Sequence, residues 1–266
     1  MSSETKMVSP GTESPGASTI GVTSSEMTSS GTSLPPKPLV YIISAPSGSG
    51  KSTLVAKLLK LVPNLEFSIS YTTRQPRGSE QNGREYFFVS RDDFQRMIDA
   101  DEFLEHAVLY GIDYYGTART VLREAERKGR DVLLDIDVQG AKQIKQRLPE
   151  AVSIFILPPD RKTLEWRLRH RGEDNDQVIQ RRLDTARREI ENYDKYNYIL
   201  INDDLQESVE GLEAIVRAER LCRSARPLTD EEKGTLALAD RCRLVNIRDR
   251  IRRILDSFSP PEGSGS

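Results

Sequence analysis

The feature of this sequence that most restricts its fold is a glycine-rich segment between an apolar run and an amphipathic stretch. The apolar run at 39–44 predicts a buried strand, and the stretch at 51–61, with apolar residues three and four apart, predicts a helix. Glycines let the backbone turn sharply and point successive N–H groups inward, and the helix start adds partial positive charge. This combination is typical of a loop that binds phosphate groups. The segment consists of Ala45, Pro46, Ser47, Gly48, Ser49, Gly50, Lys51, Ser52 and Thr53.

The polar side chains of this loop predict a nucleoside triphosphate and Mg²⁺ as its ligands. Lys51 is placed to reach the terminal phosphates, and the Ser52 hydroxyl to join the metal shell. Asp135, at the end of a second apolar run, is expected to supply a metal-shell carboxylate. An ordinary strand-end turn is the alternative for Asp135, and the loop favours the metal role. Ala45 stands where the strict pattern has Gly.

The rest of the chain repeats a rhythm of apolar strand followed by helix. Strands are expected at 132–136, 152–157 and 198–201, and helices near 139–147, near 161–170 and through 221. Alternation of this kind predicts a parallel sheet covered by helices on both faces. Between about 67 and 117 the pattern changes to short strand-like pieces, at 85–89 and 105–109, separated by turn residues. We interpret this stretch as a small, mostly antiparallel insert.

The two ends of the chain differ from its middle. Residues 1–37 are dominated by Ser, Thr, Gly, Pro and Glu, which predicts a disordered tail. Residues 226–266 are expected to form a helical extension with a disordered end. Its apolar stripe, with spacings of three and four, predicts a helix that packs on another surface. The extension could cap the core, mediate self-association or bind an unknown partner. The stripe consists of Leu244, Ile247, Ile251, Ile254 and Phe258.

Composition narrows the class of protein. The 39 basic and 41 acidic residues give a net charge of −2, without the basic excess that nucleic-acid or anionic-membrane binding requires. No apolar run approaches the length of a membrane span. Cys222 and Cys242, the only cysteines, fit a reducing compartment better than a disulfide framework. We therefore expect a cytoplasmic protein with no nucleic-acid or membrane partner.

Beyond the loop, an ordered set of motifs resembles the guanylate kinase family. The resemblance runs from about Pro38 to Cys222 in the family's order and without a large gap. Ala45 and Thr117 stand where Gly and Ser are common in the family, and we interpret both as tolerated variants. The motifs are Ser68–Arg77, Asn82–Phe88, Phe103–Glu105, Asp113–Thr117, Leu134–Asp137, Arg167 with Arg171 and Gly172, and Asn202–Leu205.

The resemblance implies an α/β fold of the P-loop NTPase type at 38–225. It would consist of a parallel sheet with helices on both faces, a small mixed-β insert at about 67–117 for the nucleoside monophosphate, and a short lid at about 167–182. The implied reaction transfers the γ-phosphoryl group of ATP to GMP, and also to dGMP, with Mg²⁺ as cofactor. ADP and GDP are the products expected from GMP, as in purine nucleotide recycling.

The resemblance also implies a role for each matching residue. The loop from Ala45 to Thr53 would bind ATP, and Asn202 would lie beside its adenine. The GMP phosphate would be held by Arg74, Arg77, Tyr86 and Tyr115. The guanine would be recognised by Ser70, Glu105 and Thr117, with Asp137 close to its edge. The catalytic residues would be Lys51, Arg74 and Asp135, together with the lid residues Arg167, Arg171 and Arg182.

Elementary chemistry supports these roles independently. Guanine presents N1–H and an exocyclic amine side by side, and a carboxylate such as Glu105 accepts both. Adenine has an acceptor at N1, so Ser70 and Glu105 argue against a kinase for another base. Related domains that act only as peptide-binding modules are the alternative from another class. Those modules typically degrade the phosphate loop, whereas Lys51 and Asp135 are present here.

Overall fold

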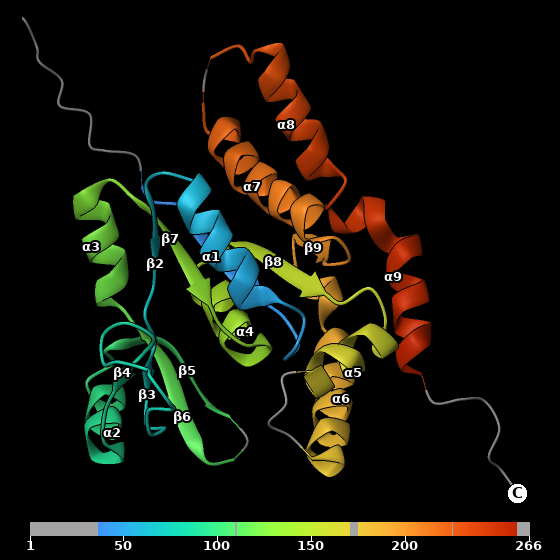
Figure 1. Ribbon diagram of the computed structural model, residues 1–266. Coiled ribbons are helices and arrows are strands. Elements are labelled where there is room, and N and C mark those ends of the chain that lie inside the picture. Colours follow the sequence, from blue (N-terminus) through green and yellow to red (C-terminus); the bar gives the residue numbers. More distant parts are fainter. Residues whose placement is uncertain (1–36, 110, 171–174, 225, 260–266) are drawn as a thin grey trace, which may run out of the picture. The chain divides into compact units, whose positions relative to one another are not determined.

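The computed structural model describes residues 37–109, 111–170, 175–224 and 226–259, and every element named below lies within them (Figure 1). All of these residues belong to one compact unit, Pro35–Ser266. The predicted tail up to residue 36, Arg171 of the predicted lid and the expected disordered end at 260–266 lie outside the described residues.

A five-stranded, wholly parallel sheet forms the centre of this unit, which confirms the predicted sheet. Its strand order is β2-β7-β1-β8-β9. The strands are β1 (Val40–Ser44), β2 (Leu65–Phe67), β7 (Asp131–Asp135), β8 (Val152–Leu157) and β9 (Tyr198–Ile201). Four of the five were predicted from apolar runs. The fifth, β2, has only three residues with a glutamate in the middle, so it carries no apolar run by which the sequence could mark it.

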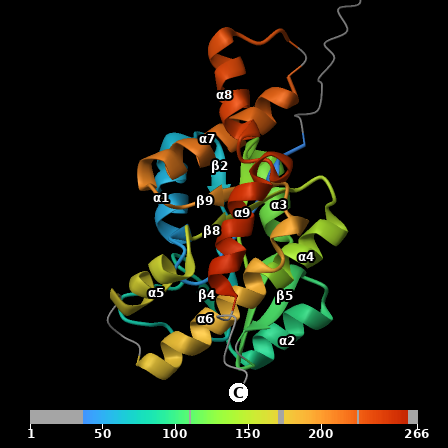
Figure 2. The same ribbon diagram turned by 90° about the vertical axis from the view of Figure 1, so that its right-hand side faces the viewer.

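Helices cover both faces of this sheet, as predicted (Figures 1 and 2). Successive residues of β1 alternate between the faces, so Tyr41 and Ile43 contact one layer of helices and Ile42 the other. The first layer is α1 (Lys51–Leu61), α7 (Leu205–Cys222) and α8 (Asp230–Asp240). The second is α3 (Thr120–Lys128), α4 (Val138–Arg147), α5 (Arg161–His170), α6 (Asp176–Ile190) and α9 (Leu244–Phe258). No helix among the described residues is long and apolar enough to cross a membrane.

A second sheet of four strands is formed by the predicted insert. Its order is β4-β3-β6-β5, with β3 and β4 parallel and the other pairs antiparallel. Phe94 of the unpredicted helix α2 stacks on Phe103 of β5, with ring centroids 4.5 Å apart. The strand expected at 85–89 is shorter because only two of its residues pair with β3. The elements are β3 (Tyr71–Thr72), β4 (Phe87–Phe88), α2 (Arg91–Asp99), β5 (Phe103–Leu109) and β6 (Asp113–Ala118).

The last two helices join the core of the first sheet. The Ile199 amide of the edge strand β9 donates to the Cys242 carbonyl at 2.7 Å, so the α8–α9 connection covers part of this edge. Ile251 of α9 is fully buried in the same cluster as Leu164 of α5 and Leu183 of α6. The backbone amide of Arg161, which begins α5, donates to Ser257 of α9. A one-turn 3₁₀ helix, Tyr193–Lys195, connects α6 to β9.

Candidate active site

The glycine-rich loop lies between β1 and α1, at the carboxyl edge of the parallel sheet. Gly48 and Gly50 have φ values of 92° and 89°, in the left-handed region that side chains disfavour. A Cβ at Gly48 would approach Leu164 and Leu168 to 2.9 Å, and one at Gly50 would approach Nδ2 of Asn202 to 2.3 Å. Both glycines are therefore required for the shape of the loop and for the close approach of its neighbours.

Lys51 begins α1 and forms an ion pair with Asp135, the last residue of β7. Their side chains are about one-fifth exposed, at 20% and 21%. β1 and β7 are neighbours in the sheet, with Ile43 opposite Asp135, which explains why residues far apart in sequence meet here. Ser52 lies exposed in the first turn of α1. The structure thus places the predicted lysine and carboxylate together beside the loop.

Two further predicted residues pack directly beside the loop. Asn202 follows β9, is 5% exposed, and donates from Nδ2 to the Ser49 carbonyl at 2.7 Å. Arg167 of α5 donates from Nη2 to the Asn202 carbonyl at 2.9 Å, and burial lowers the pKa of its guanidinium. Within the described residues, Arg167 Nη1 and Ser49 Oγ are buried without a hydrogen-bond partner. Arg182 is half-buried on α6.

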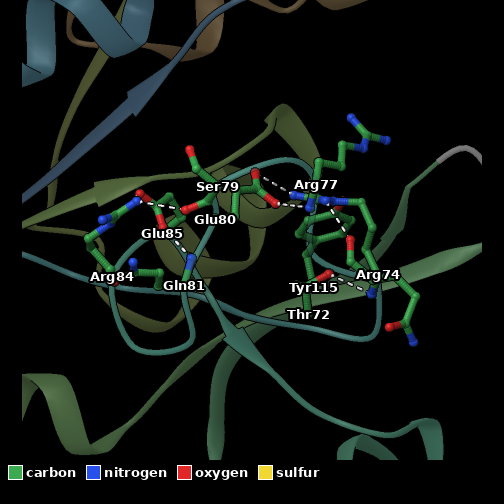
Figure 3. Close-up of polar contacts among 10 residues, drawn as sticks. Thr72, Arg74, Arg77, Ser79, Glu80, Gln81, Arg84, Glu85 and Tyr115 are labelled. Atoms are coloured by element: carbon green, nitrogen blue, oxygen red, sulfur yellow. Dashed lines mark hydrogen bonds and ion pairs between the residues drawn. The ribbon is translucent and has the colours of Figure 1, made fainter.

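Arg74 is the centre of a polar cluster on the second sheet (Figure 3). Its Nε donates to the Tyr115 hydroxyl at 3.2 Å, and its Nη2 donates to Glu80 at 3.0 Å. The guanidinium also lies over the Tyr86 ring, 5.3 Å from its centroid. The second oxygen of Glu80 accepts from the backbone amide of Arg77 at 2.8 Å, while the Arg77 side chain is exposed. All four residues predicted to hold the acceptor phosphate therefore lie in or beside this cluster.

Electrostatics connect this cluster to the loop. Burial raises the pKa of Tyr86, and the neighbouring Tyr115 and Asp135 raise it further. Asp135, which pairs with Lys51 beside the loop, therefore acts on the Tyr86 side chain of this cluster.

Glu105 is the most deeply buried carboxylate among the predicted site residues, at 3% exposed. It lies on β5 opposite Thr117 of β6, whose hydroxyl donates to it at 2.7 Å. Burial raises the pKa of Glu105 to about 7, against the lowering effect of the Thr117 hydrogen bond, and Asp137 raises it further. Asp137 itself caps α4 by accepting from the Gly140 amide at 2.8 Å. Ser70 is half-buried immediately before β3.

Two acidic residues of this region were not predicted. Glu80 makes the contacts with Arg74 and Arg77 described above. Glu189 lies in the last turn of α6, and its pKa is raised to about 7, chiefly by burial and also by Asp137, while Lys51 lowers it. Glu80 lies between Arg77 and Arg84 in a turn, and this pattern alone is only weak evidence of a functional role. Glu189 lies in an Arg-rich helix, where sequence alone cannot separate it from solvated charges.

The fold and the loop define a nucleotide-binding protein of the P-loop NTPase class. The model of the guanylate kinase family matches residues 37–219. A guanylate kinase from Koribacter versatilis is 56% identical over 222 residues, covering 82% of this chain and 95% of the relative. One from Escherichia coli K12 is 47% identical over 203 residues, covering 76% of this chain and 98% of the relative.

A solved structure shows the same likeness. The crystal structure of guanylate kinase from Anaplasma phagocytophilum matches with a TM-score of 0.58 and 31% identity, covering 83% of this chain and 97% of that one. The chain belongs to the guanylate kinase family.

Proposed function

We propose that this chain transfers the γ-phosphoryl group of ATP to the phosphate of GMP, and also of dGMP, giving ADP and GDP from ATP and GMP. Membership of the guanylate kinase family supports the proposal. The observation that carries it is the combination of an intact phosphate loop with a buried carboxylate, Glu105, on the adjoining sheet. The reaction would serve purine nucleotide recycling.

The acceptor nucleotide binds on the second sheet. Glu105 accepts the guanine N1–H and the exocyclic amine, while Thr117 fixes the orientation of its carboxylate. Ser70 and Asp137 line the edge of the base. Arg is suited to the phosphate end because its planar fork pairs two oxygens at once. The phosphate ligands are Arg74, Arg77, Tyr86 and Tyr115.

The donor nucleotide binds at the loop. Backbone N–H groups from Ala45 to Thr53 surround its phosphates, and Asn202 lies beside the adenine. Lys51, now paired with Asp135, moves its charge to the terminal phosphates when ATP binds. The unpartnered donor of Arg167 contributes to the same field, with Arg171 and Arg182 from the lid segment.

Phosphoryl transfer in this site needs no strong general base, because the acceptor oxygen already carries negative charge. Catalysis then consists of alignment and of neutralising the charge on the transferring group. Lys51 and the arginines supply the positive charge for this once both nucleotides are bound.

The oxygen donors beside the loop are suited to Mg²⁺ as the cofactor. The Ser52 hydroxyl and the Asp135 carboxylate are hard ligands, at the start of α1 and the end of the neighbouring β7. No cluster of three or more His, Cys, Asp or Glu suited to a metal occurs among the described residues. A site with the Ser52 hydroxyl and the Asp135 carboxylate as its protein ligands suits Mg²⁺, which is usually held by one or two protein ligands together with phosphates and waters. When bound, Mg²⁺ would neutralise charge on the terminal phosphates.

The remaining proposals concern partners and location. ATP and GMP are the proposed partners, and the cytoplasm is the proposed location. Self-association through the C-terminal extension stays a hypothesis. Sizing the full chain over a range of concentrations tests it. A monomer at every concentration would reject it, whereas a larger species that Val245→Glu, at an exposed side chain of α9, dissociates would support it.

An acceptor panel tests the proposed function. ADP release is measured with ATP, Mg²⁺ and GMP, AMP, UMP, CMP or dTMP in turn. GMP is expected to support turnover far better than the others, and preference for another base would overturn the assignment. Lys51→Ala should abolish turnover of GMP while circular dichroism shows a folded protein; near-normal activity would reject the role of the loop.

A further inference from the structure

The strand that carries Glu105 lies at an edge of the second sheet and is held there by a helix of the first. β5 is the last strand in the order β4-β3-β6-β5, and α4 packs along it. We propose that Gln143 and Arg147 of α4 are positioning residues that set the guanine specificity of the site. The inference rests on the proposed function, since it takes Glu105 as the group that recognises the base.

Gln143 makes the hydrogen bonds that a neighbouring strand would make with β5. Its Nε2 donates to the His106 carbonyl at 2.7 Å, and its Oε1 accepts from the His106 amide at 3.3 Å. One side-chain amide therefore pairs with both main-chain groups of the residue directly after Glu105. This is the pattern by which an antiparallel strand would hold that position. The edge of β5 is fixed at this point without a further strand.

Arg147 holds the other side of Glu105. Its Nη1 donates to the Phe103 carbonyl at 2.8 Å and to the Leu104 carbonyl at 2.5 Å. The pairing of β5 with β6 shifts register here, passing from Phe103 to Glu105 and leaving Leu104 without a partner on β6. The irregular stretch before Glu105 is thus anchored by α4 where its own sheet does not anchor it. Together, the two side chains fix the backbone on both sides of the carboxylate.

The first turn of the same helix lies against the carboxylate itself. A Cβ at Gly140 would approach Oε2 of Glu105 to 2.6 Å, so the absence of a side chain leaves room for the acid. Asp137, at the base edge, caps this turn. One helix therefore places Glu105 and Asp137 relative to each other, and its contacts with β5 decide how well Glu105 meets the base.

A positioning role differs measurably from simple structural support. Glu105 accepts two donors from guanine, but only N1–H from hypoxanthine, which lacks the exocyclic amine. Displacement of the carboxylate would cost the second hydrogen bond most, and so would reduce the preference for GMP over inosine monophosphate. Loss of stability alone would lower both activities together and leave their ratio unchanged.

Gln143→Ala tests the proposal, with Gln146→Ala as its matched control, since Gln146 is an exposed glutamine on the same helix. The quantity measured is the ratio of kcat/KM for GMP to that for inosine monophosphate. It should fall about tenfold in Gln143→Ala, the effect of one misplaced hydrogen bond to a charged group. The KM for ATP and the ratio in the control should not change. Arg147→Met, an independent variant, should lower the same ratio.

A double-mutant cycle separates action through Glu105 from any other route. In a Glu105→Gln background, Gln143→Ala should no longer change the ratio, because the group that it positions is already altered. The inference is overturned if Gln143→Ala and Arg147→Met are folded with an unchanged ratio, or if the loss is as large in the Glu105→Gln background. Wild-type protein without GMP kinase activity would instead remove the proposed function, and this inference with it.

Discussion

At the scale of a single residue, burial of Glu105 disfavours its charged form but strengthens the hydrogen bonds that it accepts. In a site that water barely reaches, the charged carboxylate is disfavoured, which is why its pKa rises to about 7. The same isolation makes each hydrogen bond from a base stronger and each mismatch more costly. Recognition of guanine nevertheless requires the ionised form, because only that form accepts two donors.

A pH dependence of GMP binding follows from this raised pKa. Glu105 is mostly ionised above its pKa of about 7 and mostly protonated below it, so affinity should fall as the pH is lowered. Between pH 8 and pH 6 the KM for GMP should rise about tenfold from this group alone. The Glu105→Gln protein supplies the control, since the GMP phosphate titrates equally with both proteins. Identical pH profiles of KM for the two proteins would contradict the prediction.

The residues of the site differ in how far the sequence could predict them. Lys51 and Asp135 follow from a motif and from strand ends, and the structure brings them into contact. Glu105, Arg74 and their neighbours were found only through the family resemblance. Glu80 was missed because its partners are Arg74 and a backbone amide of the same turn, and turn geometry leaves little trace in sequence.

At the scale of elements, Gly140 in the first turn of α4 leaves space that the Glu105 carboxylate occupies. Gly140→Ala should favour the helix by about 1 kcal/mol, since alanine is the better helix former. The added Cβ would nevertheless meet the Glu105 carboxylate. We expect the KM for GMP to rise by roughly an order of magnitude, through loss of a charged hydrogen bond, while the KM for ATP stays unchanged.

Gly234→Ala is the control for this substitution, since Gly234 also lies in a helix and a Cβ there would meet nothing within 4 Å. It should leave both KM values unchanged. Steady-state kinetics of the two variants are compared with the wild type. An equal KM for GMP in Gly140→Ala and wild type would show that the turn does not constrain the acid.

Helices and strands could be predicted where the apolar residues follow a single regular spacing along the sequence. β8 and the helices α1 and α5 have their expected bounds, because continuous apolar runs and spacings of three and four are unambiguous. In the insert the strands are two to seven residues long, and aromatic side chains pack between β3 and β4 and between α2 and β5. Such contacts depend on tertiary structure, so α2 and the limits of β4 and β5 could not be derived from local pattern.

At the scale of the whole unit, the helices after residue 226 complete the core. Cys242 belongs to the apolar cluster on one face of the first sheet, and Ile251 and Phe258 belong to that on the other. The sequence predicted an apolar stripe that would pack, but not its partner. The spacing of the stripe identifies a helix, whereas the surface that this helix covers depends on the arrangement of α5, α6 and β9.

Ile251→Ala should therefore destabilise the protein, although it lies far from the nucleotide ligands in sequence. Truncating a fully buried isoleucine typically costs about 2–5 kcal/mol, measured here as the free energy of unfolding in urea. Val245→Ala, on the same helix but at a side chain 68% exposed, should change it by less than about 0.5 kcal/mol. Equal stability of the two variants would mean that α9 does not belong to the core.

One site is proposed to hold ATP on the loop and guanine on Glu105. A crystal structure with GMP and a non-hydrolysable ATP analogue would show whether it does. We predict that both oxygens of Glu105 lie within hydrogen-bonding distance of N1 and the exocyclic amine, with the GMP phosphate on Arg74 and Tyr115. A guanine edge that faces any group other than Glu105, or GMP bound on the loop itself, would rule out this arrangement.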